Sequence, residues 1–248
     1  MRRIDRVLQM LAAAVEDADM VVLPELWISG AFDLPVARSV RSPLESATLD
    51  RVREIAERTG TWIHAGSYSE AGLSDETYNT AVLIDDRGDI AATYRKRHLF
   101  GFADGERTLM SAGSDLAVLP TPLGMTALAT CYDLRFPEMF RALVDRGATA
   151  FLVCAGWPTP RISAWQVLCR ARAIENLAWM VACNGVGAHA GIVLGGRSVI
   201  VDPRGDVVAE AGTDEEILLG QVEPGAAAEW RTAFPALEDR MPDADPRF

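Results

Sequence analysis

The sequence predicts an α/β protein in which helices cover a mixed sheet, or two stacked sheets, within one domain. The chain has 248 residues, a length that single α/β domains commonly reach. Short apolar runs typical of buried strands alternate with segments whose apolar residues recur at helical spacing. Hairpins interrupt this alternation, one of them at the turn DDRG (85–88), and they indicate a sheet that is not purely parallel.

The first half of the chain contains two predicted helices and four predicted strands. Apolar residues spaced by three or four positions predict a helix over residues 4–18, and a second helix is expected near 47–59. The segment MVVLPE (20–25) predicts a short buried strand that ends at a proline. The other strands are expected in TWIHAGSY (61–68), YNTAVLI (78–84) and DIAATYRK (89–96).

The second half continues the same alternation. A strand, a turn and a second strand are expected over 114–132, followed by a helix that opens at Pro137. The strand ATAFLVCAG (148–156) then precedes a helix over about 161–178. The remaining strand-like segments are WMVACN (179–184), GGRSVIVD (195–202), DVVAEA (206–211) and EEILLGQVE (215–223).

Composition excludes several classes of function. A net charge of -11 repels polyphosphate, so nucleic acid is not an expected partner. No apolar run reaches the roughly 18 residues of a membrane helix, so a cytoplasmic protein is expected. The four cysteines show no CxxC spacing and are expected to be reduced. No set of His, Asp, Glu or Cys has metal-ligand spacing, so neither a metal nor another cofactor is expected.

Cys131 stands where a predicted strand gives way to a polar segment that starts a helix. A free thiol has an ordinary pKa of about 8.5 and becomes nucleophilic when a base, a positive charge or a helix N-terminus favours the thiolate. The N–H groups of Tyr132 and its neighbours are expected to exert the third influence. The alternative role is a small packing residue, which suits Cys154, Cys169 and Cys183 because they lie in apolar segments.

Two further residues suit a thiol site. Lys96 shares one face of its strand with Ala92 and Tyr94, so its ammonium is expected to point inward and to need an anionic partner. Glu25 follows a buried strand and a proline, and apolar surroundings of this kind favour a general base. Taken alone, each residue also fits an ordinary role, Lys96 in a solvated basic patch and Glu25 in a strand-end loop.

A histidine is the usual base for a thiol, and the chain has three. His64 alternates within a predicted strand and fits a core or pocket position better than a base. His98 lies in the basic segment YRKRHLF and is harder to dismiss. Residue patterns alone therefore leave the base open between a histidine and Glu25.

Three motifs occur in an informative order. LPE (23–25), KRHLF (96–100) and CYDLRFPE (131–138) resemble the three signature regions of the nitrilase superfamily, the carbon–nitrogen hydrolases. The similarity continues through WPTPR (157–161), RARAIEN (170–176) and GGRSVIVDPRGDVVAEA (195–211). The resemblance implies an α-β-β-α sandwich of two stacked sheets, with dimers or higher homo-oligomers that pack through helix layers.

The resemblance also implies a catalytic triad of Glu25, Lys96 and Cys131. Glu25 would take the thiol proton, and the thiolate would attack the amide or nitrile carbon. Lys96 and the N–H of Tyr132 would stabilise the oxyanion, and ammonia or an amine would leave before water attacks the thioester. Glu106 occupies the place where many relatives carry a second active-site glutamate.

Other residues are expected around this triad. Asp104 is the neighbouring alternative to Glu106. Asn79 and the segment RARAIEN are expected to brace the site rather than to contact substrate. Arg161 is the candidate clamp for a substrate carboxylate, with Arg135 as the weaker alternative. The expected substrate contacts are Tyr132, Trp157, Pro158 and Arg161.

The form of the motifs is most similar to the ω-amidase branch, whose substrates are monoamides of dicarboxylic acids. An N-carbamoyl amine or amino-acid amidohydrolase is the alternative within the enzyme class, and a nitrilase fits less well. A catalytically silent binding protein on the same scaffold is the alternative from another class. The partner expected is therefore a small-molecule amide.

The chain departs from the resemblance at its beginning. Family members usually start with a strand ahead of the first helix, whereas this sequence opens at that helix. If one strand is missing, the sheet is expected to show an unpaired edge or a substitute strand beside MVVLPE. The whole chain, 1–248, is expected to be a single carbon–nitrogen hydrolase domain, with MPDADPRF (241–248) as a loose tail.

Overall fold

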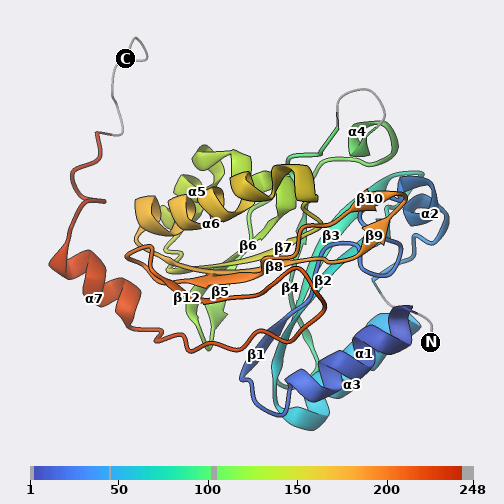
Figure 1. Ribbon diagram of the computed structural model, residues 1–248, viewed down its shortest axis with the longest axis horizontal. Helices are drawn as coiled ribbons and strands as arrows, with labels where there is room; N and C mark the ends of the chain where they lie inside the picture. Colours follow the sequence, from blue (N-terminus) through green and yellow to red (C-terminus); the bar gives the residue numbers. More distant parts are fainter. Residues whose placement is uncertain (1–2, 45, 102–104, 242–248) are drawn as a thin grey trace.

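The computed structural model describes residues 3–44, 46–101 and 105–241, and these residues form a four-layer α-β-β-α sandwich. Two stacked sheets lie between two helical layers (Figure 1), so the expected architecture is confirmed. Asp104 and most of the expected tail, residues 242–248, lie outside the described residues.

The first sheet has four strands and carries the N-terminal third of the chain. β1 pairs in parallel with β2, while β2, β3 and β4 pair antiparallel. The order is β1 (Met20–Val22), β2 (Trp62–Ala71), β3 (Thr77–Ile84) and β4 (Ile90–Arg95). The turn between β3 and β4 forms because the Asp85 carboxylate accepts the N–H groups of Arg87 and Asp89.

The second sheet has six strands and is mixed. Its centre, β6 to β8, is parallel, and antiparallel strands close both edges. The order is β12 (Val207–Glu210), β11 (Val199–Val201), β8 (Trp179–Asn184), β7 (Ala150–Ala155), β6 (Gly124–Thr130) and β5 (Val118–Thr121). All six residues of β7 are buried, as expected for a strand covered on both faces.

Helices cover the outer face of each sheet. α1 (Arg3–Ala14) and α3 (Ala47–Thr59) pack on the first sheet, and α5 (Pro137–Val144) and α6 (Ile162–Asn176) pack on the second (Figure 1). α3 illustrates the local signals, because the Ser46 side chain accepts the N–H of Leu49 and Gly60 ends the helix at φ +68°.

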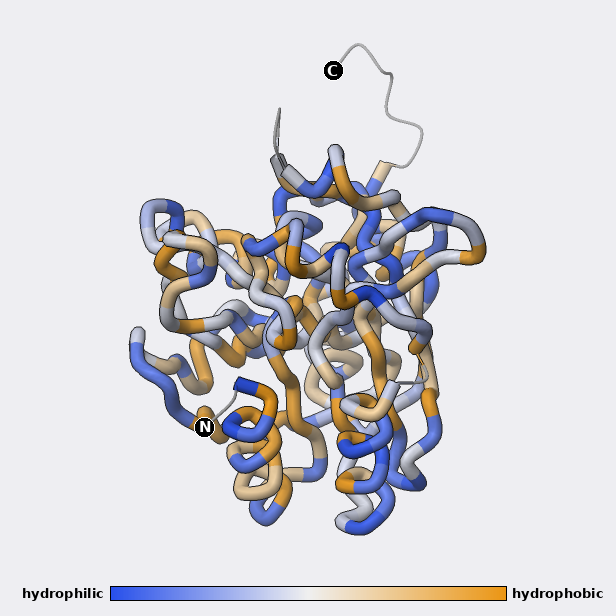
Figure 2. The backbone as a smooth tube through the Cα atoms, turned by 90° about the vertical axis from the view of Figure 1, so that its right-hand side faces the viewer, coloured by the Kyte–Doolittle hydropathy of each residue, from blue (hydrophilic) through white to orange (hydrophobic). Residues whose placement is uncertain are grey.

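Side-chain alternation in the first sheet joins the layers. Val82 and Ile84 pack toward α1 and α3, whereas Ala81 and Leu83 pack in the core between the sheets. Figure 2 shows the resulting pattern, with apolar backbone segments gathered inside and polar ones outside. The first sheet therefore contributes apolar side chains to two layers, one against α1 and α3 and one between the two sheets.

Shorter elements gather at one end of the sandwich (Figure 1). They are α2 (Leu34–Ser39), α4 (Glu106–Leu109), β9 (Ala188–His189) and β10 (Ile192–Val193). A small apolar cluster packs α2 and α4 against Leu26 and Leu99. Two 3-10 helices, η1 (Cys131–Arg135) and η2 (Thr159–Arg161), follow β6 and β7, while α7 (Ala226–Ala233) lies at the opposite end.

β1 corrects one sequence expectation and agrees with another. The strand is only three residues long and each is partly exposed, so it is not the buried strand that MVVLPE predicts. The reason is its position, because among the described residues β1 pairs only with β2 and forms the edge of its sheet. An unpaired edge beside MVVLPE was expected if a first strand is missing.

A groove of about 1120 Å³ runs along this open edge. α1, β1, β8 and residues 214–223 line it, whereas Lys96 and Cys131 do not. The strand-like segment 215–223 forms no strand, since it follows the groove as an extended chain outside both sheets. The helix expected over 161–178 begins as η2 and ends at Asn176, before Leu177 turns into the left-handed region at φ +46°.

Gly113 offers a test of how closely the chain packs behind β4. Its N–H donates to the carbonyl of Lys96 at 3.0 Å, and a Cβ at this position would lie 2.2 Å from the carbonyl oxygen of Arg95. Because backbone must shift, Gly113→Ala should lower the free energy of unfolding by about 1–3 kcal/mol, which is a few degrees in Tm. The matched control is Gly225→Ala, whose Cβ would meet nothing closer than 3.8 Å. Equal thermal melting of both variants would contradict this packing.

Candidate active site

Cys131 lies at a sharp turn between β6 and η1. β6 ends at Thr130, and Cys131 opens the 3-10 helix with φ +46°, a left-handed conformation that non-glycine residues rarely adopt. A capping box fixes this turn, because the Asp133 carboxylate accepts the N–H of Thr130 at 2.9 Å while the Thr130 side chain accepts the N–H of Asp133. The expected strand-to-helix position of Cys131 is confirmed, although the helix is a 3-10 turn.

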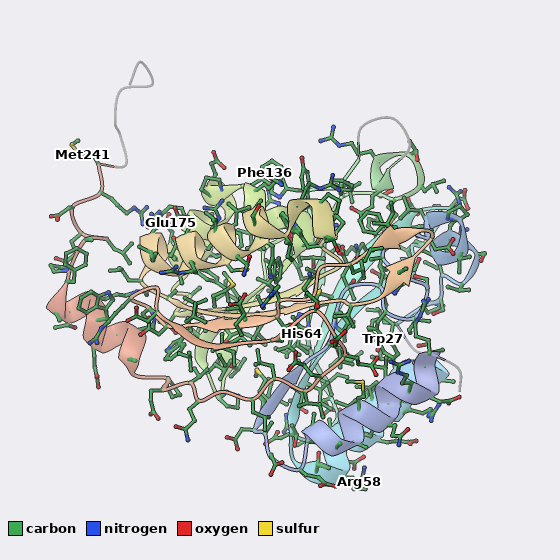
Figure 3. All side chains as sticks on the ribbon, viewed as in Figure 1. Trp27, Arg58, His64, Phe136, Glu175 and Met241 are labelled. Atoms are coloured by element: carbon green, nitrogen blue, oxygen red, sulfur yellow. The ribbon has the colours of Figure 1, made fainter. Side chains whose placement is uncertain are left out.

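Asp133 also ties this turn to the first sheet. Its buried carboxylate accepts the Tyr94 hydroxyl at 2.7 Å and the backbone N–H of His98 at 3.1 Å. The His98 ring lies 2.7 Å from Asp133 through Nδ1 and stacks on Phe136. His98 therefore holds the loop after β4 against the loop after β6. Figure 3 shows Phe136 on the side of the molecule where α5 and α6 lie.

The other two histidines have structural contacts of their own. His64 is fully buried in the interior (Figure 3), and its Nδ1 accepts the N–H of Gly66. Burial lowers the pKa of His64 to about 4, so its ring is neutral at physiological pH. Nδ1 of His189 accepts the N–H of Ala31. The charges that act on the Cys131 thiol are those of Glu25 and Lys96.

Lys96 points inward as the alternation of β4 predicts. Its side chain is 2% exposed, and its ammonium lies 2.7 Å from Glu25 Oε1 and 2.7 Å from Glu106 Oε2. Its neighbour Arg95 points to the outer side, where it pairs with Glu70 at 2.6 Å. One buried cation thus separates two buried carboxylates, and the structure brings Glu25, Lys96 and Glu106 into direct contact.

Neutral donors complete the shell around the two carboxylates. Asn79, in β3, donates from Nδ2 to Glu25 Oε1 at 2.8 Å and to Glu106 Oε1 at 2.9 Å. The N–H of Gly156 donates to Glu25 Oε2 at 2.9 Å, and the N–H of Phe100 donates to Glu106 Oε2 at 2.7 Å. Both carboxylates are therefore fixed by three kinds of donor from different parts of the chain.

Burial and charge set the protonation of this cluster. Burial raises the pKa of the Cys131 thiol well above its ordinary value, the Glu25 carboxylate raises it further, and Lys96 acts in the opposite direction. Cys131 therefore rests as a neutral thiol, so the thiolate that a helix N-terminus was expected to favour is not the resting form.

Lys96 and Glu106 differ in how burial and neighbouring charges shift their pKa values. Burial alone would lower the pKa of Lys96, but Glu106 and Glu25 outweigh it and keep the ammonium charged. Burial raises the pKa of Glu106, and the nearby charge of Glu25 raises it further, while Lys96 acts against both. The site therefore combines a permanent cation with carboxylates that compete for it.

The residues expected to contact substrate surround this cluster. Tyr132 packs edge-on against Phe100 and Phe136, with ring centroids 5.3 Å apart in each pair. Trp157 is buried, and its indole N–H donates to the carbonyl of Arg161 at 2.8 Å. Together these aromatic rings form a wall beside the strand ends that carry Cys131 and Gly156.

Pro158 and the two candidate arginines differ in exposure. Pro158 is buried and forms an isolated bridge with Leu194. Arg161 is exposed, with its guanidinium 5.1 Å from the Phe100 ring centre, and Arg135 is exposed with its guanidinium 5.1 Å from the Trp157 ring centre. Both arginines therefore lie over aromatic residues next to the cluster.

The segment RARAIEN braces the site as expected. Arg172 is buried and donates twice to the carbonyl of Leu134 in η1, at 2.6 and 3.0 Å. Arg170 donates to the carbonyl of Gly205. Asn176 donates to the carbonyl of Arg172 at the end of α6. The two hydrogen bonds from Arg172 therefore hold η1 against α6.

Two contacts at the site were not anticipated from the sequence. Asn79 was expected to be structural, yet its side chain touches both carboxylates. The N–H of Gly156 was not considered, although it contacts Glu25. No local pattern signals either contact, because each joins segments that lie far apart in the sequence.

Metal and membrane chemistry find no support in the described part of the chain. Across residues 3–44, 46–101 and 105–241, no group of three or more His, Cys, Asp or Glu side chains is arranged to hold a metal ion. Over the same ranges, no helix combines the length and apolarity needed to span a bilayer.

Similarity to known proteins extends over the whole domain. The sequence profile of carbon–nitrogen hydrolases matches residues 2–232. A 2-oxoglutaramate amidase of Paenarthrobacter nicotinovorans is 41% identical over 248 residues, which cover 97% of this chain and 84% of that protein. A 2-oxoglutaramate amidase of Bacillus subtilis is 36% identical over 226 residues, covering 91% of this chain and 86% of that protein.

Solved structures give the same result. Nit3 of Saccharomyces cerevisiae, a member of the nitrilase superfamily, superposes with a TM-score of 0.85 at 28% identity and covers 99% of this chain and 90% of its own. A mutant amidase of Nesterenkonia sp. AN1, with an acetamide moiety added covalently at its active-site cysteine, has a TM-score of 0.82 at 28% identity, covering 96% and 90%. With its fold, its clustered motifs and these matches, the chain belongs to the carbon–nitrogen hydrolase family.

Proposed function

We propose that this carbon–nitrogen hydrolase is an amidase that uses Cys131 as its nucleophile and acts on monoamides of dicarboxylic acids. The observation that carries the proposal is the buried cluster in which Lys96 bridges Glu25 and Glu106, with the charges of Glu25 and Lys96 acting on the Cys131 thiol. A thiol, a base on that thiol and a fixed cation are the groups that acyl transfer from an amide requires.

The first half of the reaction makes a thioester. Glu25 takes the thiol proton as the sulfur attacks the amide carbon, so an S–C bond forms and the carbonyl oxygen becomes an oxyanion. The Lys96 ammonium and the N–H of Tyr132, in the first turn of η1, stabilise that oxyanion. When the C–N bond breaks, Glu25 returns its proton to the leaving nitrogen and ammonia departs.

The second half releases the acid. Water attacks the thioester carbon while Glu25, again a carboxylate, accepts a proton from it. The C–S bond then breaks and the sulfur recovers a proton from Glu25. The acid formed from the substrate amide is then free to leave. Glu106 stays bonded to Lys96 throughout, which holds the ammonium in place for both oxyanions.

The proposed substrate class is supported by the position of Arg161 and by the names of two similar proteins. Two of the similar proteins are 2-oxoglutaramate amidases, whose substrate carries a carboxylate remote from its amide. A buried carboxylate needs a cationic partner. Arg161 lies over Phe100, whose N–H binds Glu106, so its guanidinium is near the reacting groups without belonging to the cluster.

We also propose that the protein acts in the cytoplasm as a homodimer. All four cysteines are free thiols, in keeping with a reducing compartment. α6 exposes Val167 at 65% and Ile174 at 46%, and apolar side chains on an outer helical layer favour contact with a second copy. The single domain proposed for the chain spans both sheets, because the core between them is continuous.

Replacing Cys131 by Ala tests the nucleophile. Amide hydrolysis should fall at least 1000-fold, on the order of the loss seen when a covalent catalyst is removed. Intact-protein mass spectrometry with a candidate amide should show a thioester on the wild type and none on the variant. Because Cys131 is partly exposed, Tm should change little. Turnover by Cys131→Ala near the wild-type rate would exclude the mechanism.

Selective alkylation tests the pairing of Cys131 with Glu25. Burial raises the thiol pKa of all four cysteines, that of Cys183 to about 12, so pKa alone does not single out Cys131. Position does, because Cys131 is partly exposed whereas Cys154 and Cys169 are buried, and Glu25 is its proposed base. Limiting iodoacetamide should therefore label Cys131 first, and Glu25→Gln should slow that reaction about tenfold or more. Faster labelling at Cys183, which is also partly exposed, would refute the pairing.

The substrate class is tested by removing the remote carboxylate. Hydrolysis of succinamate should exceed that of butyramide by about tenfold or more in kcat/KM, because a charged hydrogen bond is worth at least ~1.4 kcal/mol. Arg161→Ala should remove most of this preference and leave butyramide unchanged. Arg170→Ala, which removes an exposed arginine of α6, is the matched control.

The outcomes separate the proposals. Equal rates on succinamate and butyramide in the wild type would exclude monoamides of dicarboxylic acids and leave the thiol mechanism intact. If Arg161→Ala still prefers succinamate to butyramide, the contact with the remote carboxylate would be assigned to Arg135, which lies over Trp157. Faster turnover of an N-carbamoyl compound would favour the alternative amidohydrolase.

A further inference from the structure

Asn79 lies against the catalytic cluster from an element that contributes no other group to it. It belongs to β3, is completely buried, and accepts the backbone N–H of Lys96 through its main-chain carbonyl. Its Nδ2 reaches Glu25 Oε1 and Glu106 Oε1, at 2.8 and 2.9 Å. One neutral amide thus uses both of its hydrogens on the two carboxylates.

The orientation of this amide is dictated by the carboxylates. Asn79 Oδ1 is buried and has no hydrogen-bond partner in the part of the chain that the structure describes. Rotating the amide by half a turn would place that carbonyl oxygen against two carboxylate oxygens, which is electrostatically unfavourable. Asn79 thus keeps both N–H donors on Glu25 and Glu106 although its Oδ1 stays unsatisfied. Packing alone does not require this orientation.

The donors divide the oxygens of Glu25 into two kinds. Oε1 accepts from both Lys96 and Asn79, at 2.7 and 2.8 Å, whereas Oε2 accepts from the N–H of Gly156 at 2.9 Å. Oε2, which has the single donor, therefore keeps a free lone pair that can receive the thiol proton.

One cation serves two carboxyl groups in the cluster. Glu25 and Glu106 both contact the ammonium of Lys96. Cys131 and Cys154, from the second sheet, are neutral thiols at rest. Two ionised carboxylates that share one ammonium favour the uptake of a proton, and the two hydrogen bonds from Asn79 oppose it because they stabilise the ionised forms.

We propose that Asn79 is a positioning residue that saturates Oε1 of both carboxylates, so that both stay ionised and the proton of Cys131 passes to Oε2 of Glu25. This role rests on the proposed thiol mechanism and is independent of which amide is hydrolysed. Asn79 touches neither the nucleophile nor the expected substrate contacts in the described contacts, so it acts through Glu25 and Glu106.

The test replaces the amide and follows the pH dependence of the site. Asn79→Ala removes both donors, and Asn79→Asp places a third carboxylate where the donor was. Asn176→Asp is the matched control, because Asn176 is also completely buried with an unpartnered Oδ1 but donates to the end of α6, away from the cluster. Two profiles are recorded for each protein, the rate of Cys131 alkylation by iodoacetamide and kcat/KM for succinamate.

The expected result is a shift of the acid limb to higher pH in both profiles. The midpoint should rise by about one pH unit in Asn79→Ala and by more in Asn79→Asp, since each variant makes uptake of a proton by the carboxylates easier. At neutral pH kcat should fall about tenfold while KM stays within about threefold, because the ground-state contacts to substrate are kept. Asn176→Asp should lower Tm and leave both midpoints at the wild-type value.

Three results would overturn the role. Midpoints that coincide with the wild type in a folded Asn79 variant would make the residue merely structural. A rise in KM at constant kcat would make it a substrate contact. A shift of the same size in Asn176→Asp would make the effect nonspecific. If Asn79→Asp does not accumulate as folded protein, Asn79→Ala decides alone. Because alkylation needs no amide, a wild type inactive on succinamate would count against the proposed substrate and still leave the Asn79 role measurable.

Discussion

The ammonium of Lys96 is removed from water at the centre of the molecule, and much of the surrounding structure satisfies that one charge. A buried cation is costly unless anions and hydrogen-bond acceptors surround it. Glu25, from the loop after β1, and Glu106, from α4, supply the anions. Those carboxylates then need donors themselves, which come from Asn79 in β3 and from main-chain N–H groups. The buried charge therefore holds four separate segments together, and it is also the group poised to stabilise an oxyanion.

The sandwich brings Cys131, the proposed nucleophile, to this charge from the opposite sheet. Lys96 and Asn79 belong to the first sheet, whereas Cys131 follows the central strand β6 of the second. The left-handed turn at Cys131 is maintained because Asp133 links it to Tyr94 and His98, and Arg172 holds η1 from the other side. Rigid parts thus set the distance between sulfur and carboxylate, and the thiol can remain protonated until substrate arrives.

The reacting groups and the entrance are built from different chemistry. The cluster is buried and charged, whereas aromatic rings lie beside it: Phe100 packs edge to face with Tyr132, and Trp157 packs against Trp165. The exposed guanidinium groups of Arg161 and Arg135 lie over two of these rings. In the proposed function, these rings would face the carbon chain of a dicarboxylic monoamide, and a guanidinium group would bind its remote carboxylate.

The sequence alone determined the layered α/β class, most strand and helix positions, the inward direction of Lys96 and the three motif residues Glu25, Lys96 and Cys131. These follow from local periodicity and from motifs that can be read in order along the chain. The tertiary structure decided what depends on contacts between distant segments. It made β1 a partly exposed edge strand, assigned His98 to Asp133 rather than to the thiol, and placed Asn79 and the Gly156 N–H on the carboxylates. It also decided the protonation of Cys131, because desolvation and the charge of Glu25 exist only once the two sheets have packed.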